Sequence, residues 1–134
     1  MLLRTLFLSR LLGLYFLVCG LAMIVHRQVV VDAMAKLTSN PAAMLCLSVF
    51  TLIAGLAMVL GHNIWTTSPA AVIVTLLGWL TLIKGVVYLL LPAKWLVGFS
   101  QAALNSGTYF YSATAFVLVL GAYLTYEGFK AKPA

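Results

Sequence analysis

Residues 69–92, PAAVIVTLLGWLTLIKGVVYLLLP, decide the fold class of this chain. Ser68 and Pro69 are typical of a helix start, and Pro92 ends the segment. The 22 residues between the two prolines carry one charge, Lys84. With a rise of about 1.5 Å per residue, a helix of this length spans the roughly 30 Å hydrocarbon core of a bilayer. The stretch therefore predicts a transmembrane helix.

The composition extends this prediction to the whole chain. Of the 134 residues, 64% are hydrophobic and 7% are charged, whereas a soluble domain carries about 25% charged residues. A soluble fold of this length could not bury so much apolar surface. We therefore expect an all-α integral membrane protein in a single domain, residues 1–134. Its net charge of +6 lies mostly near helix ends, where it would meet anionic headgroups rather than nucleic acid.

Three further apolar segments predict spans, at about residues 9–26, 42–60 and 109–126. Polar and apolar residues alternate with helical spacing in two connecting segments, 27–39 and 92–107. Such segments are typical of amphipathic helices that lie at the membrane interface. We therefore expect four transmembrane helices arranged as two helical hairpins, each with a short amphipathic interfacial segment between its spans.

The halves 1–64 and 65–134 share this plan, which suggests an internal repeat. Glycines recur at near-constant offsets: Gly13 and Gly20 match Gly78 and Gly85 at 65 residues, and Gly55 matches Gly121 at 66. A parallel duplication would produce this pattern, but apolar segments also align by chance. A rival match of GLAM, at 20–23 and 55–58, pairs helices of opposite direction and is treated as coincidence.

The basic residues favour an orientation with both termini in the cytoplasm. Four of them would then lie inside, Arg4, Arg10, Lys130 and Lys132, against three outside, Arg27, Lys36 and Lys94. Cytoplasmic segments carry the excess of Lys and Arg in membrane proteins. The margin between the two sides is small. We expect the membrane to be a bacterial inner (plasma) membrane.

Lys84 is the most informative single residue, because it is the one charge inside a span. It could snorkel to the headgroups, line a path for a solute or ion, or contact a partner. Helical side chains lean toward the N-terminus of their helix, so we expect Lys84 to face the bundle interior or another subunit. Asp32 is the acid that topology places on the same side of the membrane.

A second candidate site lies in the loop that begins at Gly61. His62 and Asn63 are consistent with a helix C-cap and turn, or with a small polar site on the cytoplasmic side. Arg10 and Glu127 are expected at the same membrane surface and could close such a site. A His–Glu pair there could bind a proton or a lipid headgroup.

Trp79 is the third candidate, because it lies near the middle of its span. It could pack in a helix crossing beside Gly78, or line a pocket for a lipid-like or pigment ligand. Its indole N–H needs an acceptor within the bilayer, and Thr75 could serve.

The same topology excludes several kinds of site, so we expect no catalytic, cofactor or metal site. His26 and His62 end different spans on opposite sides of the membrane, too far apart to share one haem iron. Two histidines and two carboxylates are too few for typical zinc or di-iron sites. Asp32 and His62 also lie on opposite sides, which excludes a Ser-His-Asp triad.

Three functions remain open from the sequence. The first is a small multi-pass membrane protein without enzymatic activity, an accessory or structural subunit that acts by helix packing in a membrane assembly or homo-oligomer. The second is a small solute or ion transporter or channel that uses Lys84. The third is a lipid- or quinone-linked membrane enzyme, supported by His62, Glu127 and Trp79.

Overall fold

The computed structural model describes residues 3–131, and all regular structure within them is α-helical. In chain order the helices are α1 (Leu3–Val25), α2 (Arg27–Ser39), α3 (Pro41–Gly61), α4 (Pro69–Leu90), α5 (Ala93–Asn105) and α6 (Gly107–Lys130). Four of them, α1, α3, α4 and α6, are long and apolar enough to cross a membrane. The prediction of an all-α, multi-pass membrane protein is therefore confirmed.

Local signals in the sequence set the starts of two spans. Asn40 Oδ1 accepts hydrogen bonds from the amides of Ala42 and Ala43, at 3.0 and 3.2 Å. Ser68 Oγ accepts one from the amide of Ala71 at 3.2 Å. Each side chain thus satisfies amides that the first helical turn leaves without partners, and a proline follows each one.

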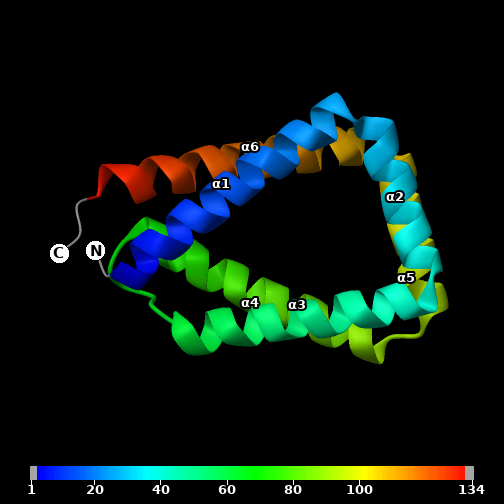
Figure 1. Cartoon of the computed structure of the whole chain (residues 1–134), viewed down its shortest axis with the longest axis horizontal. Helices are drawn as coiled ribbons and strands as arrows, with labels where there is room; N and C mark the ends of the chain where they lie inside the picture. The colour runs from blue at the N-terminus through cyan, green and yellow to red at the C-terminus, as the bar shows by residue number, and fades with distance from the viewer. Residues whose placement is uncertain (1–2, 132–134) are drawn as a thin grey trace.

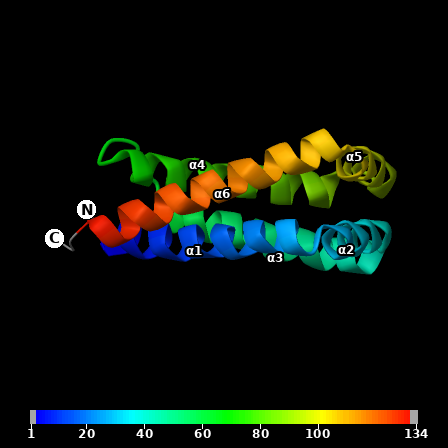
Figure 2. The same ribbon diagram turned by 90° about the horizontal axis from the view of Figure 1, so that it is seen from above.

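The helices form two stacked layers (Figures 1 and 2). The first half, α1–α2–α3, makes one U-shaped layer, and the second half, α4–α5–α6, makes the other. Stacking places α1 against α6, α3 against α4, and α2 against α5. Figure 1 shows that α1 begins, α6 ends and the α3–α4 loop turns at one end of the molecule, here called the terminal end. Helices α2 and α5 run across the opposite end, here called the far end.

The pairing of the spans differs from the expected hairpins. We expected the two spans of each half to pack together, whereas α1 pairs with α6 and α3 pairs with α4. The connecting helices explain this difference. Each has 13 residues, so it is about 20 Å long at 1.5 Å per residue. Packed helices lie about 8–10 Å apart, and a connector of this length holds the far ends of its two spans beyond that distance.

Glycines let the paired spans approach closely. A Cβ atom added at Gly13 would lie 2.5 Å from the backbone nitrogen of Thr125 on α6. One added at Gly85 would lie 2.6 Å from the backbone nitrogen of Leu52 on α3. No side chain fits at either position, so these crossings use backbone-to-backbone packing of the kind common between membrane helices.

The arginines at the two ends of the first predicted span both contact α6. Arg10 Nε donates a hydrogen bond to the carbonyl of Gly128 at 2.8 Å, and its guanidinium lies 5.0 Å from the centre of the Phe129 ring. The Arg27 guanidinium lies 5.2 Å from the Phe110 ring centre. These contacts extend the packing of α1 against α6 beyond the apolar centres of the two helices. Helix α1 therefore begins six residues before the expected start, and α6 ends at Lys130.

The offsets of 65 and 66 residues between matching glycines also relate the buried residues and the helix contacts of the two halves. The buried residues of α1 are Thr5, Leu6, Ser9, Gly13 and Gly20, and the residues 65 positions further on, Ala70, Ala71, Val74, Gly78 and Gly85, are all buried in α4. A Cβ at Gly20 would meet Leu118, and one at Gly85 would meet Leu52, which lies 66 positions earlier. The α1–α6 pair thus has the same crossing contacts as the α4–α3 pair.

Candidate functional site

The most buried titratable side chain is His62, which caps the C-terminus of α3 at the terminal end and is 2% exposed. Its Nε2 lies 2.8 Å from the Thr5 hydroxyl of α1, and its Nδ1 lies 3.3 Å from the Thr75 hydroxyl of α4. The Thr75 hydroxyl also donates to the carbonyl of Ile64 at 2.9 Å and accepts from its amide at 3.0 Å. Together these three side chains join α1, α3 and α4, and we call them the His62 cluster.

One proton arrangement satisfies every contact of the His62 cluster. The Thr75 hydroxyl donates its single hydrogen bond to the Ile64 carbonyl, so it accepts a hydrogen bond from the protonated Nδ1. Nε2 is then bare and accepts from the Thr5 hydroxyl. Burial lowers the pKa of His62, because removal from water disfavours the charged ring. The neutral ring thus acts as a donor on one side and an acceptor on the other.

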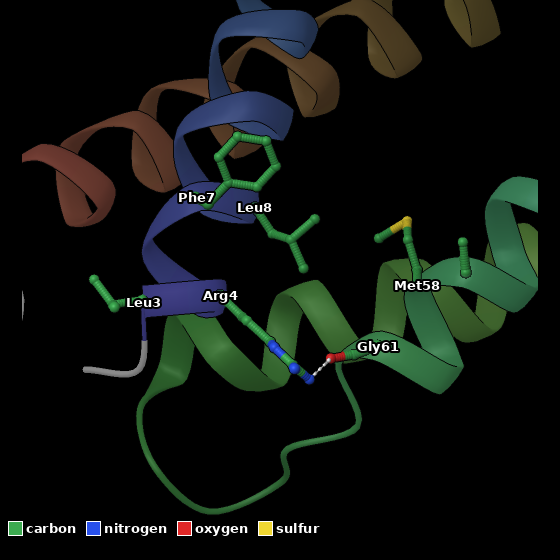
Figure 3. Close-up of a pocket in the computed structure, with 7 residues that line it drawn as sticks. Leu3, Arg4, Phe7, Leu8, Met58 and Gly61 are labelled. Atoms are coloured by element: carbon green, nitrogen blue, oxygen red, sulfur yellow. Dashed lines mark hydrogen bonds between the residues drawn. The ribbon is translucent and has the colours of Figure 1, made fainter.

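A cavity of about 430 Å³ lies beside this cluster, between the start of α1 and the end of α3. Its lining is apolar except near Arg4, whose Nη1 donates a long hydrogen bond of 3.5 Å to the carbonyl of Gly61. Figure 3 shows Leu8 of α1 and Met58 of α3 on either side of the cavity, with Phe7 above them. The full lining is Leu3, Arg4, Phe7, Leu8, Ala57, Met58 and Gly61.

The other residues of the expected cytoplasmic site have separate partners. Arg10 reaches the Gly128 carbonyl, and Asn63 Oδ1 accepts from the indole Nε1 of Trp65 at 2.8 Å. Glu127 is half-buried on α6, one residue before the glycine that Arg10 contacts. The fold therefore brings these groups to the terminal end, but His62 makes its described hydrogen bonds to threonines rather than to a carboxylate.

Lys84 does not face the interior of the bundle within this chain, so another subunit is the expected contact that remains. Its side chain is exposed on α4, and its Nζ lies 5.3 Å from the centre of the Tyr88 ring. Tyr88 is one helical turn closer to the end of α4, so the ammonium group extends toward the far end rather than toward the centre. Asp32, the acid expected beside it, is exposed and accepts a hydrogen bond from Gln28 Nε2 at 3.0 Å. The amine extends toward the helix end because water and headgroups solvate it there.

Trp79 lies on the outer surface of α4 with 38% of its area exposed. Gly78, its neighbour, occupies the crossing and would meet Met58 of α3 if it had a Cβ. Thr75, the acceptor expected for the indole, bonds instead to residues of the α3–α4 loop. Trp79 is therefore neither within the crossing nor part of the lining of the cavity near Arg4.

Two residues of the His62 cluster, Thr5 and Thr75, were missed as functional candidates. A signal for Thr5 exists in the sequence, because Thr5, Ser9 and Gly13 follow at intervals of four residues and form a small, polar stripe on one helix face. All three are buried against other spans. The Ser9 hydroxyl is buried without a hydrogen-bond partner. Small polar residues at helical spacing near a span end thus indicated a contact face.

Among residues 3–131, no three His, Cys, Asp or Glu side chains gather closely enough to hold a metal ion. His26 is exposed at the junction of α1 and α2, toward the far end, while His62 is at the terminal end. The polar groups of the terminal end thus include the buried histidine with its threonine hydroxyls, Arg4 and Arg10, and the side chains of Asn63, Glu127 and Lys130. Searches with the chain found no matching protein-family model, no matching curated protein and no matching solved structure.

Proposed function

We propose that this protein has no enzymatic activity and acts as an accessory or structural subunit, by packing its helices in a membrane assembly. The pairing of the spans supports this proposal best. Each span packs most extensively against one other span, with a smaller contact between α1 and α4, whereas a helix in a closed four-helix bundle packs along two neighbours. The divergent spans α1 and α3 leave apolar faces, with Phe50 71% and Leu60 82% exposed on α3. Helices of a partner or of a second copy would cover such faces.

The His62 cluster supports a structural role for the residues at the terminal end. Both ring nitrogens lie within hydrogen-bond distance of threonine hydroxyls, and burial keeps the ring neutral. A general base or a metal ligand needs a free nitrogen that faces its substrate or ion. The exposed position of Lys84 supports snorkelling, so neither the transport nor the enzyme alternative gains an observation in its favour.

We further propose that α2 and α5 lie at the outer interface of a bacterial inner (plasma) membrane, with both termini in the cytoplasm. They run across the ends of the spans rather than along them (Figure 1). The terminal end carries Arg4, Arg10 and Lys130, and the far end carries Arg27, Lys36 and Lys94. Lys132, the residue that tips the balance of charge inward, is outside the described residues.

The matching contacts support an internal duplication of residues 1–64 and 65–134. A two-fold axis along the spans would exchange α1 with α4 and α3 with α6. Each partner pair then maps onto the other, as their glycine contacts do. The hydrogen bond from Ser48 Oγ to the Met44 carbonyl also recurs 66 residues later, from Thr114 Oγ1 to the Phe110 carbonyl.

Crosslinking in the source membrane, followed by native mass spectrometry, tests the proposed function. Cys46 is exposed on α3 and Cys19 is half-buried, so a Cys19→Ala variant carries a photo-crosslinker at Cys46 alone. We expect one defined adduct and a heteromeric complex of fixed stoichiometry after gentle extraction. A matched variant with its only cysteine at Ser112, on the exposed surface of α6, should give a different adduct or none. Release of only monomers, with lipid adducts at both positions, would contradict the proposal.

A further inference from the structure

The cavity beside Arg4 is a built feature of this fold, and its size suits a ligand. Its volume of about 430 Å³ is within the range of roughly 300–1,000 Å³ typical of small-molecule sites. The rim residues Leu3 and Phe7 are 67% and 64% exposed, so the cavity opens at the protein surface between α1 and α3. Because both helices are spans, this opening faces the acyl chains of the bilayer.

At one position of the cavity lining the two halves of the sequence differ in side-chain size. Ala57 lines the cavity, and the residue 66 positions later on α6 is Tyr123. Tyr123 packs against the core cluster of Ala70, Val74 and Leu124. In the first half, Ala57 contributes only a methyl group to the cavity lining. An apolar space that opens to lipid is filled by lipid, because an empty space forfeits van der Waals contacts.

Arg4 supplies a charge at the mouth of this space. Its guanidinium is near the carbonyl end of α3, at the level where the spans end and headgroups begin. One nitrogen makes the long bond to Gly61, which leaves further donors of the planar fork for a phosphate. The residue 65 positions later is Pro69, so the second half has no charge at the matching position.

We infer that this cavity binds an anionic phospholipid, with an acyl chain between Leu8 and Met58 and its phosphate on Arg4. The lining supplies apolar contact for the chain, and Arg4 supplies charge-assisted hydrogen bonds at the depth of the headgroup. This inference goes beyond the proposed function and does not depend on it. A lipid bound here would occupy the space between the start of α1 and the end of α3 at the terminal end.

Native mass spectrometry of the full chain in detergent, with added lipid, tests this inference. The probes are palmitoyl-oleoyl phosphatidylglycerol and phosphatidylcholine, which share acyl chains and differ in net charge. We expect the wild type to retain phosphatidylglycerol about tenfold better, because charge-assisted bonds separate the two headgroups. Arg4→Gln should abolish this preference, while Lys94→Gln, a change of an exposed cation at the far end, should preserve it.

A second pair of variants tests the acyl-chain site. Ala57→Phe adds a large side chain to the cavity lining, and we expect it to reduce retention of both lipids. Ala54→Phe adds the same side chain on an exposed position of α3 outside the lining, and retention should stay at the wild-type level. Unfolding temperatures of both variants confirm that they are folded.

Equal retention of the two lipids by the wild type, or equal effects of Ala57→Phe and Ala54→Phe, would overturn the inference. Displacement of phosphatidylglycerol by millimolar inorganic phosphate would also overturn it. The same holds for a dimer that forms through α1 and α3 and excludes lipid.

Discussion

The Thr5 hydroxyl lies 2.8 Å from His62 Nε2 and joins the first turn of α1 to the C-cap of α3 across 57 residues of sequence. Both side chains are almost fully buried. This bond links the α1–α6 pair to the α3–α4 pair at the terminal end, and it is shorter and more buried than the 3.5 Å bond from Arg4 to the Gly61 carbonyl. An unpaired ring nitrogen in this position would keep its desolvation cost without a compensating bond.

Loss of the Thr5 hydroxyl should therefore destabilise the fold. Thr5→Val keeps the shape of the side chain but leaves His62 Nε2 without a donor. We expect the free energy of unfolding to fall by about 1–2 kcal/mol, measured by chemical denaturation in detergent micelles. Thr66→Val, in the exposed part of the α3–α4 loop, is the matched control and should change little. Equal effects of the two variants would show that the Thr5 bond contributes no stability.

The close crossing of α3 and α4 should not tolerate a methyl group. A Cβ at Gly55 would lie 2.5 Å from Leu82 Cα, whereas one at Gly98 on α5 meets nothing within 4 Å. Gly55→Ala should cost about 1–3 kcal/mol through overpacking. Gly98→Ala should be neutral or stabilising by up to about 1 kcal/mol, because alanine favours the helix. Thermal unfolding of the two variants measures the difference, and the reverse order would contradict this crossing.

Stability should fall below neutral pH because of His62. Burial lowers its pKa in the folded state from the ordinary value of 6.5, so the unfolded chain binds more protons below that pH. The contribution is complete above about pH 6.5 and is lost as the pH falls toward the lowered folded value, by at most about 1.4 kcal/mol per pH unit.

The pH dependence is measured by denaturation between about pH 7.5 and 5 for the wild type, His62→Gln and His26→Gln. We expect His62→Gln to flatten the profile in this range. His26 is exposed, so its replacement should leave the profile unchanged. A profile that His62→Gln does not alter would assign the acid sensitivity to other groups.

Removal of the charge at Lys84 should leave fold and assembly intact. Its ammonium group extends over the Tyr88 ring from an exposed position, so Lys84→Met removes a charge whose cost snorkelling already reduces. We expect an equal or higher unfolding temperature and an unchanged oligomeric state by native mass spectrometry. Loss of a solute flux in proteoliposomes on Lys84→Met, with the fold retained, would instead support the transport alternative.

The helices themselves were largely predictable from local sequence. The starts at Pro41 and Pro69 follow from an N-cap residue before each proline, and the bounds of α2 match the expected segment 27–39. The ends of α1 and α6 were less predictable, because their outer turns depend on contacts with each other through Arg10 and Gly128. Such contacts join residues 118 positions apart and leave no local pattern.

The candidate site was predictable in part. The sequence singled out His62 and its loop, because a glycine and two polar side chains follow an apolar span there. It could not show that Thr5 and Thr75 complete the cluster, since their hydroxyls come from different spans. The inward orientation of Lys84 was inferred from the average lean of helical side chains, but the solvation of its charge outweighs that tendency.

By itself, the sequence determined the solvent of this protein and its secondary structure: apolar segments of about 20 residues must form helices in lipid, since every backbone amide there needs an internal partner. Only the tertiary structure decided which spans pair, because apolar faces are interchangeable in a bilayer and the choice rests on geometry. The lengths of α2 and α5 separate the spans of each half, and the glycines admit α6 to α1 and α4 to α3. The same pairing leaves a cavity lined by Ala57 between the start of α1 and the end of α3.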